Sequence, residues 1–254
     1  MTQKQNVKFK IILIMLLLTS SIFINNPVSS MSAIEWDKDK LRVDGVTLRH
    51  KRVINFTHSA DVNSLDIDSH HGEYNIFGGD EFNLTVTIYE KKEDDVFLTF
   101  EDGYLKAKSR SDSPCAIGSI KGTIPNGINL IIDSGAGNFN LSNFNGLDID
   151  LDIGAGKIDI ENCNAENIII DCGVGSITLS TAKTKSIDID CGTGSIKFND
   201  VLSKNIKADT GVGAISATDC TIEKANFDTG IGSISTDNCQ IKHKNFSTGL
   251  GHID

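Results

Sequence analysis

Apolar and polar residues alternate over the second half of the chain in a pattern that repeats every 19 residues. Each copy opens with a Gly-x-Gly triplet, and the seven triplets begin at Gly135, Gly154, Gly173, Gly192, Gly211, Gly230 and Gly249. A fixed period of this length is the signature of a solenoid, in which each copy forms one turn of a coil. The sequence therefore predicts an all-β fold, a parallel β-solenoid with 19-residue coils.

Two short strands per copy follow from the alternation. Shortly after the triplet, apolar positions such as Phe139 and Leu141 flank a polar one, and a second alternating set, such as Ile168 and Ile170, precedes the next triplet. Successive side chains of a strand point to opposite faces, so the apolar sets should point into the coil. The residue between the two glycines is mostly apolar, and we expect it to point inward, while both glycines adopt backbone angles that a Cβ disfavours.

A second corner is predicted before a third inward column, which begins with Phe144 and Cys163. Asn and Asp suit a corner because their side chains can bond the backbone of a turn. The residues at this corner are Asn143, Asn162, Thr181, Asp200, Asp219 and Asn238. Each coil should therefore have three short faces around a narrow apolar core, with neighbouring strands about 4.8 Å apart.

Three segments divide the chain. Residues 1–30 have a positively charged start, a 14-residue, mostly apolar run from Ile11 to Ile24, and small residues before position 31. They are expected to be a signal peptide. The alternative is an uncleaved N-terminal membrane anchor, which is less favoured because the run is short for a span of about 20 residues. Either alternative places the rest of the chain outside the cytoplasm. Residues 31–64 should form a leader or N-terminal cap, and residues 65–254 the β-solenoid domain, with regular repeats from about residue 116.

The first part of this domain is expected to be irregular and β-rich. Leu65–Ile76 aligns with the later copies, and Cys115–Ile120 is a degenerate copy that departs from the pattern at Gly122 and Pro125, where we expect an irregular turn. The next inward set after Leu65–Ile76 should be Leu84, Val86 and Ile88.

The order of these segments also resembles a known family. The chain resembles the bacterial putative-adhesin domains of unknown function in the order of three parts: Leu65–Ile76, the segment Gly122–Leu130 and the stacked Gly-x-Gly copies. That group includes LiaG-like envelope proteins and is similar to the head-GIN domain. The resemblance covers roughly residues 60–254 and implies an exported or membrane-anchored β-solenoid without established chemistry. No functional residue is carried over from it.

An acidic column precedes the triplets by two residues. Its members are Asp133, Asp152, Asp171, Asp190, Asp209 and Asp228. Carboxylates stacked about 4.8 Å apart repel by roughly 1 kcal/mol per pair even in water. The favoured interpretation is that each accepts hydrogen bonds from the triplet amides, as in an Asx turn. The alternative is a row of Ca²⁺ ions, although calcium-binding β-rolls have a different, nonapeptide repeat.

The cysteines and histidines are weaker candidates. Cys172 and Cys191 are neighbours in one column, and Cys220 and Cys239 in another, so disulfides are compatible with an exported protein. Because these columns also hold Ile, Ala, Val and Thr, small buried side chains are the favoured interpretation. A metal site at His70, His71 and Glu73 is disfavoured because adjacent strand residues point to different sides, and an exposed corner is expected instead.

The net negative charge of the chain limits the kinds of binding partner that are expected. The formal net charge is −10, and removal of residues 1–30, which hold three lysines and no acid, leaves 34 acidic against 21 basic residues. This balance argues against nucleic acid and against docking on an anionic membrane, so membrane contact is expected only through the N-terminal segment. The chain has no Gly-x-Ser-x-Gly, no His-Glu-x-x-His and no phosphate loop, and the triplets lack the third Gly and the helix of a dinucleotide site.

We therefore expect a non-enzymatic, extracytoplasmic module without a cofactor. It would be a cell-surface adhesin or envelope scaffold whose polar faces bind an envelope glycan or protein. The alternatives are a calcium-stabilised surface protein and a polysaccharide-active β-helix enzyme, which is disfavoured because residues 135–254 contain no Trp and no Tyr. The sequence ends at Asp254, inside the seventh copy, so self-association through the C-terminal coil end is a further expectation.

Overall fold

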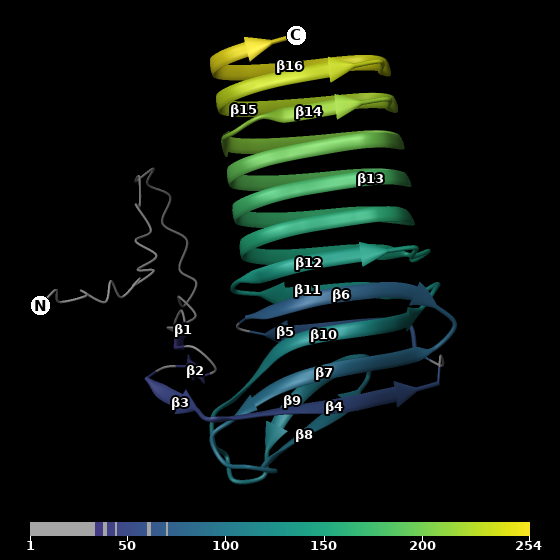
Figure 1. Ribbon diagram of the computed structural model, residues 1–254. Coiled ribbons are helices and arrows are strands. Elements are labelled where there is room, and N and C mark those ends of the chain that lie inside the picture. Colours follow the sequence, from purple (N-terminus) through teal and green to yellow (C-terminus); the bar gives the residue numbers. More distant parts are fainter. Residues whose placement is uncertain (1–33, 38–39, 44, 60–61, 70) are drawn as a thin grey trace, which may run out of the picture. The chain divides into compact units, whose positions relative to one another are not determined.

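The structure is a computed structural model that describes residues 34–37, 40–43, 45–59, 62–69 and 71–254 (Figure 1). The predicted signal peptide or anchor, residues 1–30, lies outside the described residues. Ser32–Asp254 forms one compact unit by its internal contacts. The described part is all-β, as predicted, and holds no helix of the length and apolar character that a membrane crossing requires.

The strands follow one another along the chain with short connections. They are β1 (Ile34–Asp37), β2 (Lys40–Val43), β3 (Val46–Leu48), β4 (His50–His58), β5 (Ser64–Ser69), β6 (Gly72–Gly79), β7 (Phe82–Glu90), β8 (Val96–Glu101), β9 (Tyr104–Ser109), β10 (Cys115–Pro125), β11 (Asn129–Ser134), β12 (Gly137–Ser142), β13 (Asp148–Val212), β14 (Ile215–Thr218), β15 (Thr221–Asp237) and β16 (Gln240–Ile253).

From β11 onward the strands lie parallel in a stack, drawn from teal to yellow in Figure 1. Paired residues are separated by 19 positions, as in Phe139 with Ile158, Ile196 with Ile215 and Phe227 with Phe246. The like positions of successive copies are therefore direct neighbours, and their apolar side chains pack on one another. This column is fully buried from Phe139 to Ile234, while its last member, Ile253, is exposed.

The triplet corner needs glycine for two reasons. The second glycine of most triplets has φ between +147° and +158°, and a Cβ placed on Gly213 would lie 1.6 Å from the carbonyl oxygen of Gly194 in the neighbouring coil. At the first glycine only close approach matters, since a Cβ on Gly211 would lie 2.6 Å from the Gly192 carbonyl oxygen. The backbones of adjacent coils thus touch at this corner.

The residue between the two glycines points outward, so the prediction that it points inward is wrong. Val174 and Ile231 are 49% and 51% exposed. The inside of the corner is filled instead by the residue before the triplet. Thr229 is fully buried there, and its hydroxyl donates a hydrogen bond of 2.9 Å to the Gly213 carbonyl oxygen.

The second corner is confirmed. Its six residues, Asn143 to Asn238, have φ between +51° and +56°, the left-handed region that Asn and Asp tolerate best among non-glycine residues. Their side chains also bond along the stack, as in Asn162 Nδ2 to Asn143 Oδ1 at 2.6 Å.

The lower part of the unit mixes parallel and antiparallel pairs. β5 and β6 pair in parallel with β11 and β12, so Leu65–Ile76 does stack as a coil. β7 instead runs antiparallel to β4 and β10, so the placement of Leu84, Val86 and Ile88 in a next coil is wrong, although all three are buried. β10 continues through Gly122 and Pro125 without the expected turn, which comes at Gly127 with φ +83°.

A small antiparallel sheet of β1, β2 and β3 precedes β4. Its residues Leu41, Val43 and Leu48 form a second apolar cluster with Tyr89 and Ala116, at the ends of β7 and β10. Part of the predicted leader, residues 31–64, is thus tied to the antiparallel strands by its own small core.

Candidate functional site

The acidic column is continuous on the outside of the stack. Pairing places Asp133 between Asp68 and Asp152, and Asp209 beside Asp228, with one carboxylate per coil. The side chains are exposed, apart from the half-buried Asp209. The sequence prediction that these residues form one column is therefore correct in geometry.

Electrostatics in this column are repulsive. Partial burial, followed by the charge of Asp152, raises the pKa of Asp171, and partial burial with the charges of Asp171 and Asp209 raises the pKa of Asp190. Lys207 relieves part of the repulsion, with its Nζ 3.1 Å from both Asp209 Oδ2 and Asp188 Oδ1.

The turn-capping interpretation fails at several of these positions. Within the part of the chain that the structure describes, Asp152, Asp171 and Asp190 are exposed and form no hydrogen bond to the triplet amides. The described residues also contain no group of three or more His, Cys, Asp or Glu side chains placed to hold a metal ion. Calcium binding by the column stays a prediction.

Salt should distinguish a column of mutually repelling carboxylates from a column that binds calcium. We expect NaCl to raise the melting temperature by screening the repulsion, and CaCl₂ at matched ionic strength to give an equal rise. Asp190→Asn should also raise it, by removing one charge from the row. A larger, chelator-sensitive rise with calcium that disappears in Asp190→Asn would instead make the column a calcium site, because a ligand of the folded state must stabilise it.

The cysteines lie inside the coil. Cys163, Cys172, Cys191 and Cys220 are buried, Cys115 and Cys239 are partly buried, and all six are free thiols. The thiol of Cys172 donates to Cys191, which raises the pKa of Cys172 and lowers that of Cys191 to about 7. Burial raises the pKa of Cys163 to about 11. These positions fit the favoured interpretation of cysteine as a small core side chain.

His71 lines a depression of about 570 Å³ with Lys51, Glu73, Tyr89 and Lys121. Burial lowers the pKa of His71, and the nearby Glu73 opposes this shift. His71 is half-buried, whereas the sequence suggested an exposed corner; His70 is outside the described residues. The depression is formed by β4, β6, β7 and β10, and no sequence signal brought these strands together.

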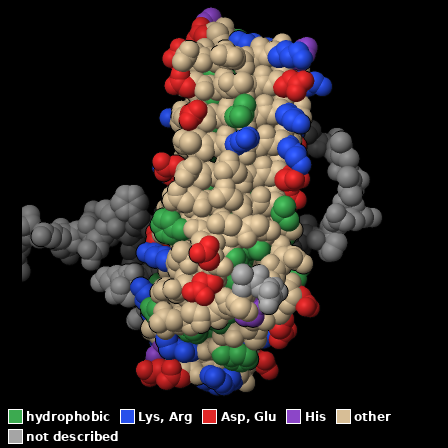
Figure 2. All heavy atoms as spheres, turned by 90° about the vertical axis from the view of Figure 1, so that its right-hand side faces the viewer, with side chains coloured by type: hydrophobic (Ala, Val, Ile, Leu, Met, Phe, Trp, Pro, Cys, Tyr) green, Lys and Arg blue, Asp and Glu red, His purple; other side chains and the backbone are tan. Residues whose placement is uncertain are grey.

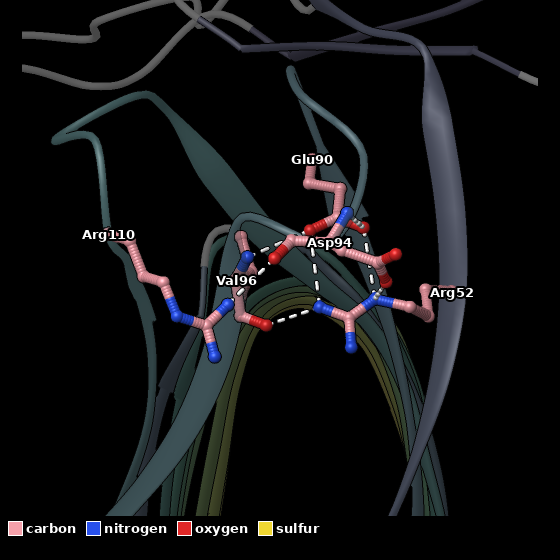
Figure 3. A network of polar contacts seen from close by, with 5 residues as sticks. All are labelled: Arg52, Glu90, Asp94, Val96 and Arg110. Atoms are coloured by element: carbon pink, nitrogen blue, oxygen red, sulfur yellow. Dashed lines mark hydrogen bonds and ion pairs between the residues drawn. The ribbon is translucent and has the colours of Figure 1, made fainter.

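A network of charged and polar groups joins the end of β7 to β4 and to the β7–β8 connection (Figure 3). Glu90 is 1% exposed and accepts from Arg52 Nε at 3.0 Å and from the Val96 amide at 2.9 Å. Glu90 Oε1 also accepts a hydrogen bond from the Asp94 amide at 3.2 Å. Arg110 donates to the Asp94 carbonyl oxygen at 2.7 Å. Burial raises the pKa of Glu90, but the bonds from Arg52 and the two amides outweigh it, so the net pKa is lowered. The network fixes the β7–β8 connection and holds no reacting group.

Comparison with known proteins gives a family and a fold. The family model described as Toastrack DUF4097, a domain of unknown function, matches residues 20–201. No curated protein matches the chain.

Two solved structures are similar over most of their length. A putative adhesin from Bacteroides fragilis NCTC 9343 is 16% identical, with a TM-score of 0.50 over 80% of this chain and 96% of that chain. A putative adhesin from Parabacteroides distasonis ATCC 8503 is 13% identical, with a TM-score of 0.51 over 81% of this chain and 97% of that chain. At such identities the similarity establishes a shared fold.

Proposed function

Because the chain belongs to the Toastrack DUF4097 family, whose function is unknown, we propose that it is a non-enzymatic surface module, an adhesin or an envelope scaffold that binds a glycan or protein of the cell envelope. In this proposal the parallel stack is a β-solenoid of 19-residue coils, and residues 1–30 deliver it outside the cytoplasm. The solved neighbours named as putative adhesins support the proposal through their shared fold.

The observation that carries the proposal is the regularity of the outward faces. On the face after each triplet, the central outward residue changes from Asn140 through Asp159, Thr178 and Lys197 to Ser216, one per strand spacing. Buried columns behind this face hold the backbone rigid, so the polar groups keep a fixed spacing of about 4.8 Å. Such an array suits a repeating polymer or a flat protein surface, and it needs no loop to move.

Binding without turnover is the expected result for the purified full chain. Incubated with cell-envelope polymers, it should bind saturably and leave the length distribution of the polymer unchanged, and in intact cells it should be labelled by a membrane-impermeant reagent. Release of soluble fragments that depends on the protein would instead favour the polysaccharide-active enzyme. Protection from the reagent until the cells are lysed would contradict a surface location.

A further inference from the structure

A groove crosses several coils on the side of the stack between the second corner and the next strand. It encloses about 670 Å³, within the usual size range of ligand pockets. Its lining includes three apolar residues, three lysines and one acidic residue, together with four uncharged polar residues; the first seven are Leu202, Ile222, Ile241, Lys183, Lys204, Lys242 and Glu223. No sequence signal had marked this surface as a site.

The apolar part forms the floor. Ile222 is 2% exposed and belongs to the main core, and Ile241 packs against that core. Leu202 is 46% exposed, so the floor presents aliphatic surface to whatever lies in the groove. The lining contains no aromatic side chain, which disfavours single-stranded nucleic acid, because bases bind to such channels by stacking on aromatic rings.

The lysines give the groove a charge opposite to that of the protein. Lys183 and Lys204 have no ion-pair partner within the described part of the chain, and Lys242 is 3.8 Å from Glu223. In Figure 2, blue side chains gather along the upper right edge of one side of the stack, interrupted by single acidic ones. The unpaired ammonium groups of Lys183 and Lys204 beside an aliphatic floor, on a chain of net charge −10, favour an anionic ligand whose carbon chain can lie on that floor.

The spacing and type of the cations narrow the ligand further. Lys204 lies one coil beyond Lys183 and two positions further along its strand. Lys242 lies two coils beyond Lys204, with Glu223 in the coil between them, so successive lysines are about 8 and 10 Å apart. All three cations are lysines, which bind phosphate as point charges.

We propose that this groove binds an extended polyol-phosphate polymer along the stack axis, with phosphates at Lys183 and Lys204 and the polyol carbons on Leu202 and Ile241. The proposal rests on the envelope-binding function proposed above and names its ligand.

The test is binding of a synthetic poly(glycerol phosphate) chain to the full-length protein, measured by calorimetry at several salt concentrations. We expect Lys183→Gln/Lys204→Gln to weaken binding about tenfold, which is the effect of losing two modest charge contacts. The matched control, Lys91→Gln/Lys108→Gln, removes two exposed lysines outside the groove and should keep the wild-type affinity. Leu202→Asp should abolish binding by placing a carboxylate on the floor.

Three outcomes would overturn the assignment. If both double variants weaken binding equally, the attraction is non-specific. If polygalacturonate binds as tightly or more tightly, the ligand is a carboxylate polymer. If inorganic phosphate alone competes at low concentration, the groove is a small-ion site. If the phosphate polymer fails to bind while the protein still binds whole envelope preparations without turnover, the groove assignment falls and the proposed function stands.

Discussion

Gly213→Ala is expected to remove more than about 4 kcal/mol from the free energy of unfolding, or to unfold the coils around it. The new Cβ would lie 1.6 Å from the Gly194 carbonyl oxygen, and the φ of +155° strains any residue with a side chain. The coils would have to separate, which breaks ladder bonds such as Gly213 N to Ile231 O at 2.9 Å. Urea unfolding and amide exchange of residues 194–232 would measure the effect.

The matched control is Gly127→Ala. Gly127 also has positive φ, +83°, but a Cβ there meets nothing within 4 Å. It should cost about 1–2 kcal/mol, the strain of the left-handed conformation alone. Similar losses for the two variants would show that close stacking of the coils at the triplet corner is not what requires glycine.

Glu90→Ala is expected to cost about 3 kcal/mol, because it removes the buried acceptor of the Val96 and Asp94 amides and leaves Arg52 with only the exposed Asp94, at 3.4 Å, as an ionic partner. The milder Glu90→Gln variant isolates the charge. The folded state lowers the pKa of Glu90 below its unfolded value of about 4.3, so its stabilisation is complete above that pH and is lost as the pH falls through the folded pKa.

Acid unfolding measures this contribution. The urea midpoint of the wild type should drop between about pH 4.5 and pH 3 by more than that of Glu90→Gln, while the exposed Glu101→Gln should follow the wild type. The acidic column acts in the opposite direction, since the raised pKa values of Asp171 and Asp190 mean that protonation relieves repulsion, and it is common to all three proteins. Parallel pH curves for wild type and Glu90→Gln would refute a buried, charged Glu90.

Much of the stack could be predicted because each position is repeated. An apolar residue that recurs in one column, such as Ile158 or Ile177, is buried by packing against its own copies in neighbouring coils. Asn162, in a column that is mostly Asn and Asp, predicts a corner. The outward position of the Ile231 side chain could not be predicted, because an apolar residue is expected to point inward. The interior of the corner is instead occupied by Thr229, which the sequence pattern does not reveal.

The lower strands were harder for a physical reason. The alternation of apolar and polar residues shows that β7 is a strand with one buried face. The same alternation is expected whether the neighbouring strands are parallel or antiparallel, so the pattern does not determine the direction of pairing. Arg52 and Glu90, which are separated by 38 residues, meet only because β4 and β7 pair antiparallel. The groove lysines lie on coils that the 19-residue period stacks together. What makes Lys183 and Lys204 a candidate site is the absence of ion-pair partners in the described part of the chain, which the sequence alone does not show.

The position of β6 between β10 and β12 has a consequence for how the chain assembles. Both neighbours of β6 come later in the sequence, and Ser69 meets Ser134 across 65 residues, whereas later coils close loops of 19. Closing the longer loop costs about 1 kcal/mol more chain entropy, and no finished coil is present to receive it. Each later coil adds to a completed edge, so the stack should grow from its base toward the C-terminus, and formation of the base should set the folding rate.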